Sequence, residues 1–87
     1  MPVRRLARDE IGDRGTAIYL TKLRPLLDPF MTGQFVAIDV ETEDYEVASD
    51  PDVASDRLWK RQPEAQILVE RIGHASVFHA LRSRSTK

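Results

Sequence analysis

Two carboxylates one residue apart, Asp39 and Glu41, come nearest to a catalytic motif by their type and spacing. They follow a hydrophobic run, Phe35–Ile38, and precede Thr42. Paired carboxylates at the end of a strand can hold divalent metal ions that activate water for phosphodiester cleavage. That chemistry needs at least two further carboxylates, and a histidine or tyrosine that positions the water. Asp39 and Glu41 therefore supply only part of such a site.

The run Phe35-Val36-Ala37-Ile38-Asp39-Val40-Glu41-Thr42 resembles the first motif of the DEDD exonucleases, a hydrophobic strand that ends in Asp-x-Glu-Thr. The rest of that family's pattern is missing. No aspartate follows Asp56, and the later acidic and histidine residues are Glu64, Glu70, His74 and His79. We therefore reject the exonuclease interpretation, and we expect Asp39 and Glu41 to alternate outward along a strand or to stand near a turn.

No other catalytic or metal-binding pattern stands out. His74 and His79 lack third and fourth ligands at a zinc-site spacing. Ser76, which lies between them, is not surrounded by a nucleophile elbow. The glycines form no phosphate-binding loop, and the absence of cysteine excludes disulfides and thiol chemistry. We predict no catalytic residue, no metal site and no cofactor.

Length and composition indicate one small globular domain. The chain has 87 residues, of which 41% are hydrophobic and 31% are charged, an ordinary globular balance. No apolar run approaches the ~20 residues that cross a bilayer, and the early arginines have no apolar core behind them. We expect a cytoplasmic protein without a membrane segment or signal peptide.

The net charge of −1 conceals a strong segregation of charge along the chain. Residues 1–24 hold six basic and three acidic side chains, residues 25–56 hold nine acidic and no basic ones, and residues 57–87 hold seven basic and two acidic ones. Two interpretations remain open. The acidic middle is either a solvated face balanced by basic neighbouring elements, or a surface that receives a basic partner.

The elements that position these residues begin with a helix. Apolar spacing predicts a helix between Arg4 and Leu27, strongest over Thr16–Leu23 and frayed or broken over residues 1–15 because Gly12 and Gly15 interrupt it. Pro25 is expected to end or kink this helix. Asp28-Pro29 and Thr32-Gly33 are expected to connect it to the first strand.

The remaining elements predict an α+β fold with the order α-β-β-α-β-β. Phe35–Val40 and Tyr45–Ala48 form a hairpin around Thr42–Asp44. Asp50 caps a helix that begins at Pro51 and runs to about Gln62. The chain is then expected to form a strand over Gln66–Ile72, a turn at Gly73-His74, a fourth strand or short helix over Ser76–Leu81, and a disordered tail over residues 82–87. The single domain, residues 1–87, thus contains a small, mainly antiparallel sheet, with the second helix as a right-handed crossover and both helices against one face.

Several short motifs resemble a family of small uncharacterised bacterial proteins. They are Gly33-Gln34-Phe35-Val36-Ala37-Ile38-Asp39, Asp44-Tyr45-Glu46-Val47, Arg61-Gln62-Pro63-Glu64-Ala65 and Arg71-Ile72-Gly73, within a match that covers about Thr16 to Val77. Members of that family are often encoded beside a retropepsin-like aspartic protease, so the resemblance implies a two-gene module with a protein partner. The strand-strand-helix-strand order also resembles HicB-like antitoxins, an analogy of fold alone.

These observations predict a non-enzymatic bacterial protein-interaction module, the partner of a neighbouring gene product or of a second copy. The expected contact residues are Glu41, Glu43, Asp44, Glu46 and Trp59, together with any free sheet edge. Trp59 has an alternative role in packing at the edge of its helix. The alternative function is an antitoxin-like regulator that binds a toxin and DNA through Arg57, Lys60, Arg61, Arg82 and Arg84, although the acidic middle makes a broad nucleic-acid surface unfavourable.

Overall fold

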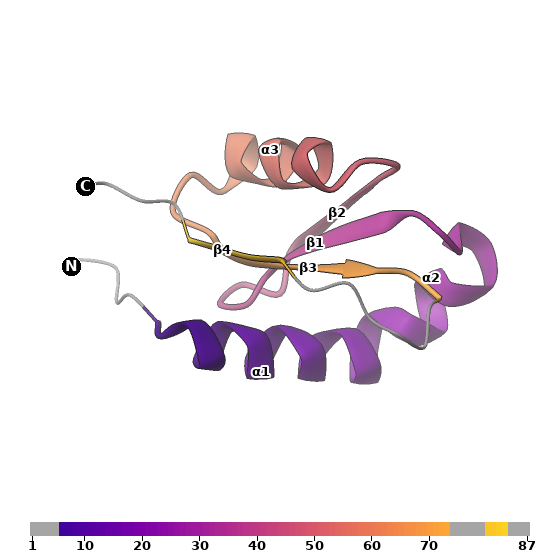
Figure 1. Cartoon of the computed structure of the whole chain (residues 1–87), viewed down its shortest axis with the longest axis horizontal. Coiled ribbons are helices and arrows are strands. Elements are labelled where there is room, and N and C mark those ends of the chain that lie inside the picture. The colour runs from indigo at the N-terminus through magenta and orange to yellow at the C-terminus, as the bar shows by residue number, and fades with distance from the viewer. Residues whose placement is uncertain (1–5, 74–79, 84–87) are drawn as a thin grey trace.

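A helical arm opens the fold. The computed structural model describes residues 6–73 and 80–83, and in it α1 (Arg8–Ile18), the π-helical turn η1 (Tyr19–Leu23) and α2 (Arg24–Met31) follow one another directly (Figure 1). The amide of Arg24 donates to the carbonyl of Tyr19, the five-residue spacing of a π-helix. We call the whole run Arg8–Met31 the helical arm.

The helical arm is continuous through the segment that was expected to be frayed or broken. α1 starts at Arg8, within the predicted range of Arg4 to Leu27, and it contains both Gly12 and Gly15. Two features stabilise its first turn: the Glu10 carboxylate accepts a hydrogen bond from the Ala7 amide at 3.1 Å, and acidic side chains stand at the positive end of the helix dipole. The prediction of a frayed segment is therefore wrong from Arg8 onward, while residues 1–5 lie outside the described residues.

Pro25 does not end the helix, and Asp28-Pro29 is not a connection. Both prolines lie in α2, with Pro25 in its first turn. The wide π-helical turn directly before Pro25 already replaces the regular α-helical hydrogen bonds, so the arm tolerates a residue without an amide hydrogen at this position. The π-helical turn before Pro25 thus separates two α-helical segments without interrupting the arm, and the turn to the first strand comes only at Thr32-Gly33, as predicted.

The sheet confirms the predicted α+β fold. Its strands are β1 (Phe35–Asp39), β2 (Tyr45–Ala48), β3 (Gln66–Arg71) and β4 (Ala80–Ser83), in the order β2-β1-β3-β4 with antiparallel pairing throughout. α3 (Pro51–Arg61) crosses over β1 from β2 to β3. Its predicted cap is confirmed, since Asp50 Oδ1 accepts hydrogen bonds from the Asp52 and Val53 amides at 2.8 and 3.3 Å.

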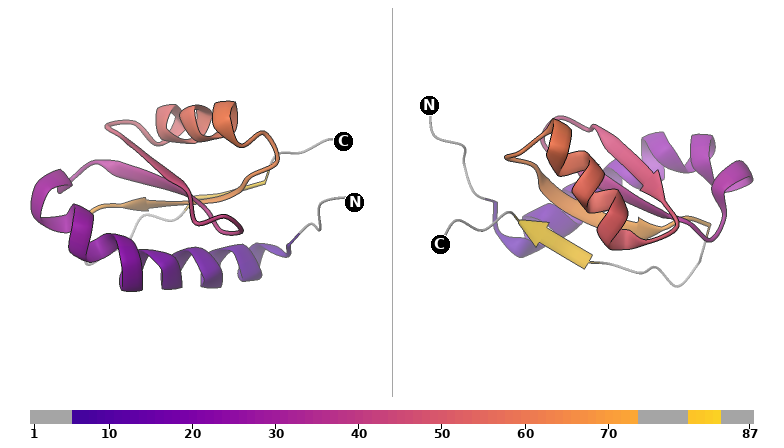
Figure 2. Two further views of the ribbon diagram at one scale, coloured as in Figure 1. Left: turned by 180° about the vertical axis from the view of Figure 1, so that it is seen from behind. Right: turned by 90° about the horizontal axis from the view of Figure 1, so that it is seen from above.

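The helices cover opposite faces of the sheet. Figure 1 shows α1 below the strands and α3 above them, and Figure 2 shows the same layers from behind and from above. Ile38 and Leu68 pack with the helical arm, whereas Ala37, Ile67 and Val69 pack with Ala54 and Leu58 of α3. The expectation of both helices on one face is therefore wrong. Neighbouring residues of β1 and β3 are apolar on both faces, and both faces need a cover.

The C-terminal prediction is correct only in part. Ala80 and Leu81 lie in β4, which agrees with a fourth strand, but Arg82 and Ser83 belong to that strand rather than to a disordered tail. His74 to His79, and the tail from Arg84 onward, lie outside the described residues. Within residues 6–73 and 80–83, no helix combines the length and apolar character of a membrane-spanning helix.

Candidate interaction surfaces

The Asp39 carboxylate is used by the hairpin turn. Asp39 is only 2% exposed, and its oxygens accept hydrogen bonds from the Glu41 amide at 3.0 Å and from Thr42 Oγ1 at 2.9 Å. Asp39 therefore stands near the turn, as one of the two expectations had it, and does not point outward. The Asp-x-Glu-Thr run is a turn motif here. In the described part of the chain, no group of acidic and histidine side chains is arranged to hold a metal ion.

The predicted acidic contact residues lie together around this hairpin, and each one is beside a cation of the same chain. We call Glu41, Glu43, Asp44 and Glu46 the acidic hairpin. Its ion pairs join Glu41 to Arg14 at 4.0 Å, Glu43 to Lys22, and Asp44 and Glu46 to Arg61, with 2.7 Å between Arg61 Nη2 and Glu46 Oε2. The hairpin is thus tied to the helical arm on one side and to α3 on the other.

Arg61 is the most connected of these cations. Its guanidinium donates to Asp44, to Glu46 Oε2 at 2.9 Å and to the Tyr45 carbonyl at 3.1 Å. The hydrogen bond from Arg61, with a second from Gln62, lowers the pKa of the Asp44 carboxyl below its ordinary value. The hydrogen bonds from Arg61 to Asp44 and Glu46 raise the pKa of Arg61. Asp44 is therefore held in its charged form by its neighbours.

The outer edge of β2 is covered by arginine side chains. The Asp44 carbonyl accepts from the Asp39 amide at 2.8 Å, so Tyr45 and Val47 turn their backbone groups away from β1. Arg61 donates to the Tyr45 carbonyl at 3.1 Å, and Arg57 Nη1 donates to the Val47 carbonyl at 3.3 Å. These contacts occupy positions that an added strand would need.

Two residues of the predicted nucleic-acid surface lie together beside β2. Arg57 and Arg61 both turn toward β2, where they hydrogen-bond to its backbone. Lys60 is exposed on α3, and Arg82 belongs to β4 by its backbone. Arg84 lies outside the described residues. Among the described side chains of this set, the structure therefore brings Arg57 and Arg61 together.

Trp59 closes the C-terminal end of α3. Its indole Nε1 donates to the Ala65 carbonyl at 2.9 Å, and its ring packs, partly buried, against the core cluster that contains Leu58 and Ile67. This contact fastens the helix to the loop before β3. Of the two roles considered for Trp59, the geometry agrees with packing.

A partly buried polar contact joins the helical arm to the end of β3. The Tyr19 hydroxyl donates to Asp28 Oδ1 at 2.5 Å and accepts from the Gly73 amide at 3.2 Å. Burial, followed by the hydrogen bond to Asp28, raises the pKa of Tyr19 above its ordinary value. One side chain thus connects η1 to α2 and to the turn after β3.

An apolar surface that sequence reasoning missed lies on α2. Pro25, Leu26, Pro29 and Phe30 are all exposed, with Leu26 at 59% and Phe30 at 79%, while Leu23 and Leu27 point into the core. We call these four exposed residues the α2 face. Their spacing of one, three and four residues is the signal for a shared helical face. It goes unnoticed once Pro25 is taken as the end of the helix.

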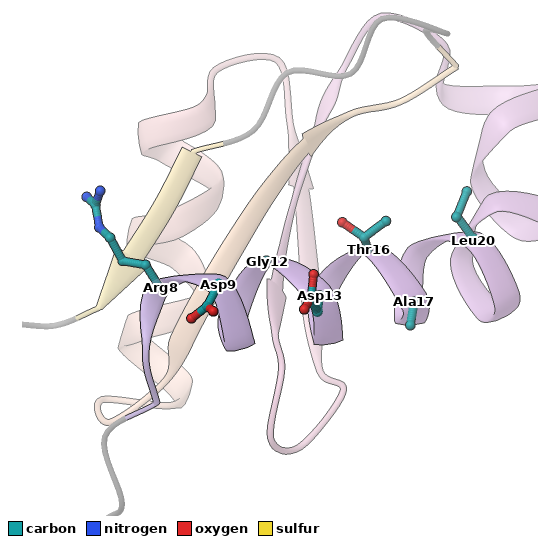
Figure 3. A pocket seen from close by; sticks show the side chains of 7 residues that line it. All are labelled: Arg8, Asp9, Gly12, Asp13, Thr16, Ala17 and Leu20. Atoms are coloured by element: carbon teal, nitrogen blue, oxygen red, sulfur yellow. The ribbon is translucent and has the colours of Figure 1, made fainter.

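A shallow groove runs along the outer side of α1. It has a volume of about 470 Å³ and is lined by Arg8, Asp9, Gly12, Asp13, Thr16, Ala17 and Leu20. In Figure 3, Thr16 and Leu20 point to one side of the helix and Ala17 points to the other, while Gly12 lies between Asp9 and Asp13 along it. The small residues in the middle leave the space, and we call this feature the α1 groove.

No protein-family model, curated protein or solved structure matches the chain. The resemblance to the small bacterial family therefore stays a prediction.

Proposed function

We propose that the protein is a non-enzymatic interaction module of the bacterial cytoplasm that docks to a protein partner through the α2 face. The observation that carries this proposal is the exposure of Leu26 and Phe30, 59% and 79%, on one side of α2. They are four residues apart and therefore lie next to each other on the helix. The α2 face combines them with two exposed prolines, so it is apolar throughout.

The physical support is the free energy of apolar surface in water. Burial of such surface contributes roughly 25 cal/mol per Å². Single exposed apolar side chains are ordinary, but adjacent ones mark interaction sites. A partner groove that accepts residues i and i+4 of a helix is a common recognition mode, and aromatic side chains are enriched at such contacts.

The acidic hairpin supports docking less well than the sequence suggested. A basic partner would have to displace Arg61 from Asp44 and Lys22 from Glu43, so the gain from each new ion pair is offset by the loss of an existing one. The edge of β2 is likewise covered by Arg57 and Arg61. The four side chains of the α2 face are apolar and have no ion pair to break.

The support for a non-catalytic role comes from Asp39. This carboxylate is the strongest catalytic candidate in the sequence, and the hairpin turn engages both of its oxygens. Removal of the Glu41 amide and the Thr42 hydroxyl from Asp39 would open the turn. A metal-dependent reaction at this position would therefore compete with the fold.

Affinity purification of the tagged chain from its own cells, with the products of neighbouring genes co-expressed, tests the proposal. We expect a stoichiometric protein partner that is lost with the double variant Leu26→Ser/Phe30→Ser. Val53→Ser is the matched control because Val53 is another exposed apolar residue, 41% exposed, on α3. Circular dichroism of each variant checks that the fold is kept.

Two results would contradict docking through the α2 face. In the first, the partner is lost with Glu41→Lys/Glu43→Lys and kept with Leu26→Ser/Phe30→Ser, which moves the contact to the acidic hairpin. In the second, nucleic acid is recovered in place of a protein, released by salt and dependent on Lys60 and Arg84. That result would favour the antitoxin-like regulator.

A further inference from the structure

We propose that the outer edge of β4 is a second docking surface, which receives an extended, acidic segment of a protein partner as an added strand. We call the backbone amides and carbonyls of Leu81 and Ser83 that point away from β3 the β4 edge. This inference concerns a surface other than the α2 face and does not rest on docking there.

The hydrogen bonds of β3 show which of its residues face β4. The Val40 amide donates to the Gln66 carbonyl at 3.1 Å, so the backbone of Gln66 turns toward β1. Successive residues of an antiparallel strand turn their backbone groups to opposite sides. Ile67 and Val69 therefore turn theirs toward β4.

The register then fixes the direction of the β4 backbone. Ile67 and Val69 pair with Arg82 and Ala80, respectively, so these two residues of β4 bond to β3. Leu81 and Ser83 alternate with them and direct an amide and a carbonyl outward. In the view from above in Figure 2, β4 forms the margin of the sheet on the side away from β2.

The two edges of the sheet differ in how they are covered. Within residues 6–73 and 80–83, the side chains that hydrogen-bond to the outer backbone of an edge strand are those of Arg57 and Arg61, and both do so on β2. An uncovered edge is a template for another strand, and addition of an extended segment to such an edge is a common recognition mode. The β4 edge is therefore the better site for strand addition.

The charge of the C-terminal segment indicates the chemistry of the occupant. Glu70 is the last acidic residue of the chain, and residues 71–87 contain four basic ones. One of these, Arg82, lies in β4 itself. Cross-strand pairs of opposite charge stabilise a sheet, so a strand with acidic side chains is the matching partner.

A second copy of the chain fits the β4 edge less well. In the antiparallel register that pairs Leu81 of each copy with Ser83 of the other, Arg82 stands directly opposite Arg82 of the second copy. Like charges directly opposite each other destabilise a strand pair. The charge of β4 therefore favours a different, acidic chain over self-pairing.

Titration of the isotope-labelled full chain with short peptides, followed by NMR, tests the proposal. One peptide alternates valine with glutamate and the other alternates valine with lysine, because valine favours extended backbone. We expect the glutamate peptide to bind about tenfold more tightly or better, and to slow hydrogen exchange at the Leu81 and Ser83 amides. Exchange at the Ala80 and Arg82 amides, which bond to β3, should change less.

Two variants make the test specific. Ser83→Pro removes an outward amide hydrogen and no hydrogen bond to β3, and proline is tolerated at such a position of an edge strand. We expect the dissociation constant of the glutamate peptide to rise about tenfold or more, whereas Ser83→Ala, the matched control, keeps the amide and binds like wild type. Arg82→Glu keeps every backbone group and should reverse the preference in favour of the lysine peptide. Circular dichroism checks the fold of each variant.

Several results would overturn the proposal. They are binding of neither peptide, equal binding of both, and binding that leaves exchange at the Leu81 and Ser83 amides unchanged. A wild-type dimer that Ser83→Pro abolishes would also overturn it, because a second copy would then occupy the β4 edge. Failure here leaves the α2 face untouched: Leu26→Ser/Phe30→Ser should bind the glutamate peptide like wild type, and that face is tested separately by loss of the native partner.

Discussion

Gly15 of α1 lies directly against Leu68 of β3, so that a Cβ atom at Gly15 would stand 2.4 Å from Leu68 Cδ2 and 2.5 Å from Leu68 Cβ. The glycine is therefore a packing residue in a continuous helix. It lets the helical arm approach the sheet closely at the centre of the core that contains Ile11 and Ile38.

This contact reverses the usual effect of a glycine in a helix. By helix propensity alone, Gly15→Ala would stabilise the fold by about 1 kcal/mol. We expect it to destabilise by about 1–3 kcal/mol, because Leu68 and β3 must move to admit the methyl group. Urea unfolding measures the change, and Ala17→Gly, expected to lose about 1 kcal/mol through propensity, is the matched control. A Gly15→Ala chain as stable as wild type would show that α1 can move away from β3.

Tyr19 is expected to make stability sensitive to alkaline pH. Its pKa is raised in the folded state, so the unfolded chain releases the proton first. The stabilisation is fully present below pH ~10 and is lost as the pH rises through the folded-state pKa. Tyr19→Phe loses the hydrogen bonds to Asp28 and Gly73, about 1 kcal/mol at neutral pH, and should decline less above pH ~10. Urea unfolding of the two chains over this pH range measures the effect. An equal decline in the free energy of unfolding of both chains would contradict this role of Tyr19.

Asp44 is expected to make stability sensitive to acid. Its pKa is lowered in the folded state by Arg61. The stabilisation is present above the ordinary carboxyl pKa of ~3.9 and is lost as the pH falls through the lower folded-state value. Asp44→Asn should therefore be less stable than wild type at pH ~7, and the two should converge in strong acid. Since the pair is partly exposed, added salt should narrow the difference at neutral pH. A difference that is independent of both pH and salt would exclude this ion pair as its origin.

The hairpin turn depends on the Asp39 carboxylate. Asp39→Ala leaves the Glu41 amide and the Thr42 hydroxyl without their acceptor, and we expect a loss of about 1–3 kcal/mol of unfolding free energy. Asp39→Asn keeps one carbonyl oxygen and should recover part of that loss. Thermal unfolding of both variants measures the effect. Equal stability of Asp39→Ala and wild type would show that the turn does not depend on these side-chain hydrogen bonds.

Arg57 and Arg61 protect the outer edge of β2. With both replaced by alanine, the Tyr45 and Val47 carbonyls become available to a strand from another molecule. We expect Arg57→Ala/Arg61→Ala to form aggregates beyond the wild-type assembly state, detected as a slow rise in light scattering. Lys60→Ala removes a positive charge from the same helix and should not aggregate. Aggregation of both variants to the same extent would assign the effect to net charge instead.

The strands and α3 could be predicted because their signals are local. The β-branched run of Phe35–Asp39 and the Asp50-Pro51 start of α3 depend only on neighbouring residues. The sequence also indicates that both faces of the sheet are covered, since Ile67, Leu68 and Val69 are consecutive apolar residues that point to both faces of β3. The wrong prediction of both helices on one face was based on the connections between the strands and did not use this pattern.

The helical arm could not be predicted in full because its continuity depends on distant contacts. A proline such as Pro25 ends most helices, and no local sequence pattern indicates the π-helical turn before it. That turn is fastened by Tyr19, whose hydroxyl meets Gly73 from the end of β3. Because the helix was expected to end or kink at Pro25, the α2 face was not predicted either. The charge segregation, in contrast, indicated that opposite charges meet in neighbouring elements, but not that Arg61 would bind both Asp44 and Glu46.

The π-helical turn has a consequence for chain length. Gly15, Tyr19, Leu23 and Leu27 are all buried at steps of four, although each such step turns a regular α-helix by about 40°. The wider turn over Tyr19–Leu23 takes up an extra residue and brings the column back toward the sheet. The turn therefore behaves like a one-residue insertion whose extra length is accommodated within the turn itself. A relative with one residue fewer in this turn would have an ordinary α-helix there and could keep every strand in place, so a gap at this position is compatible with the same architecture.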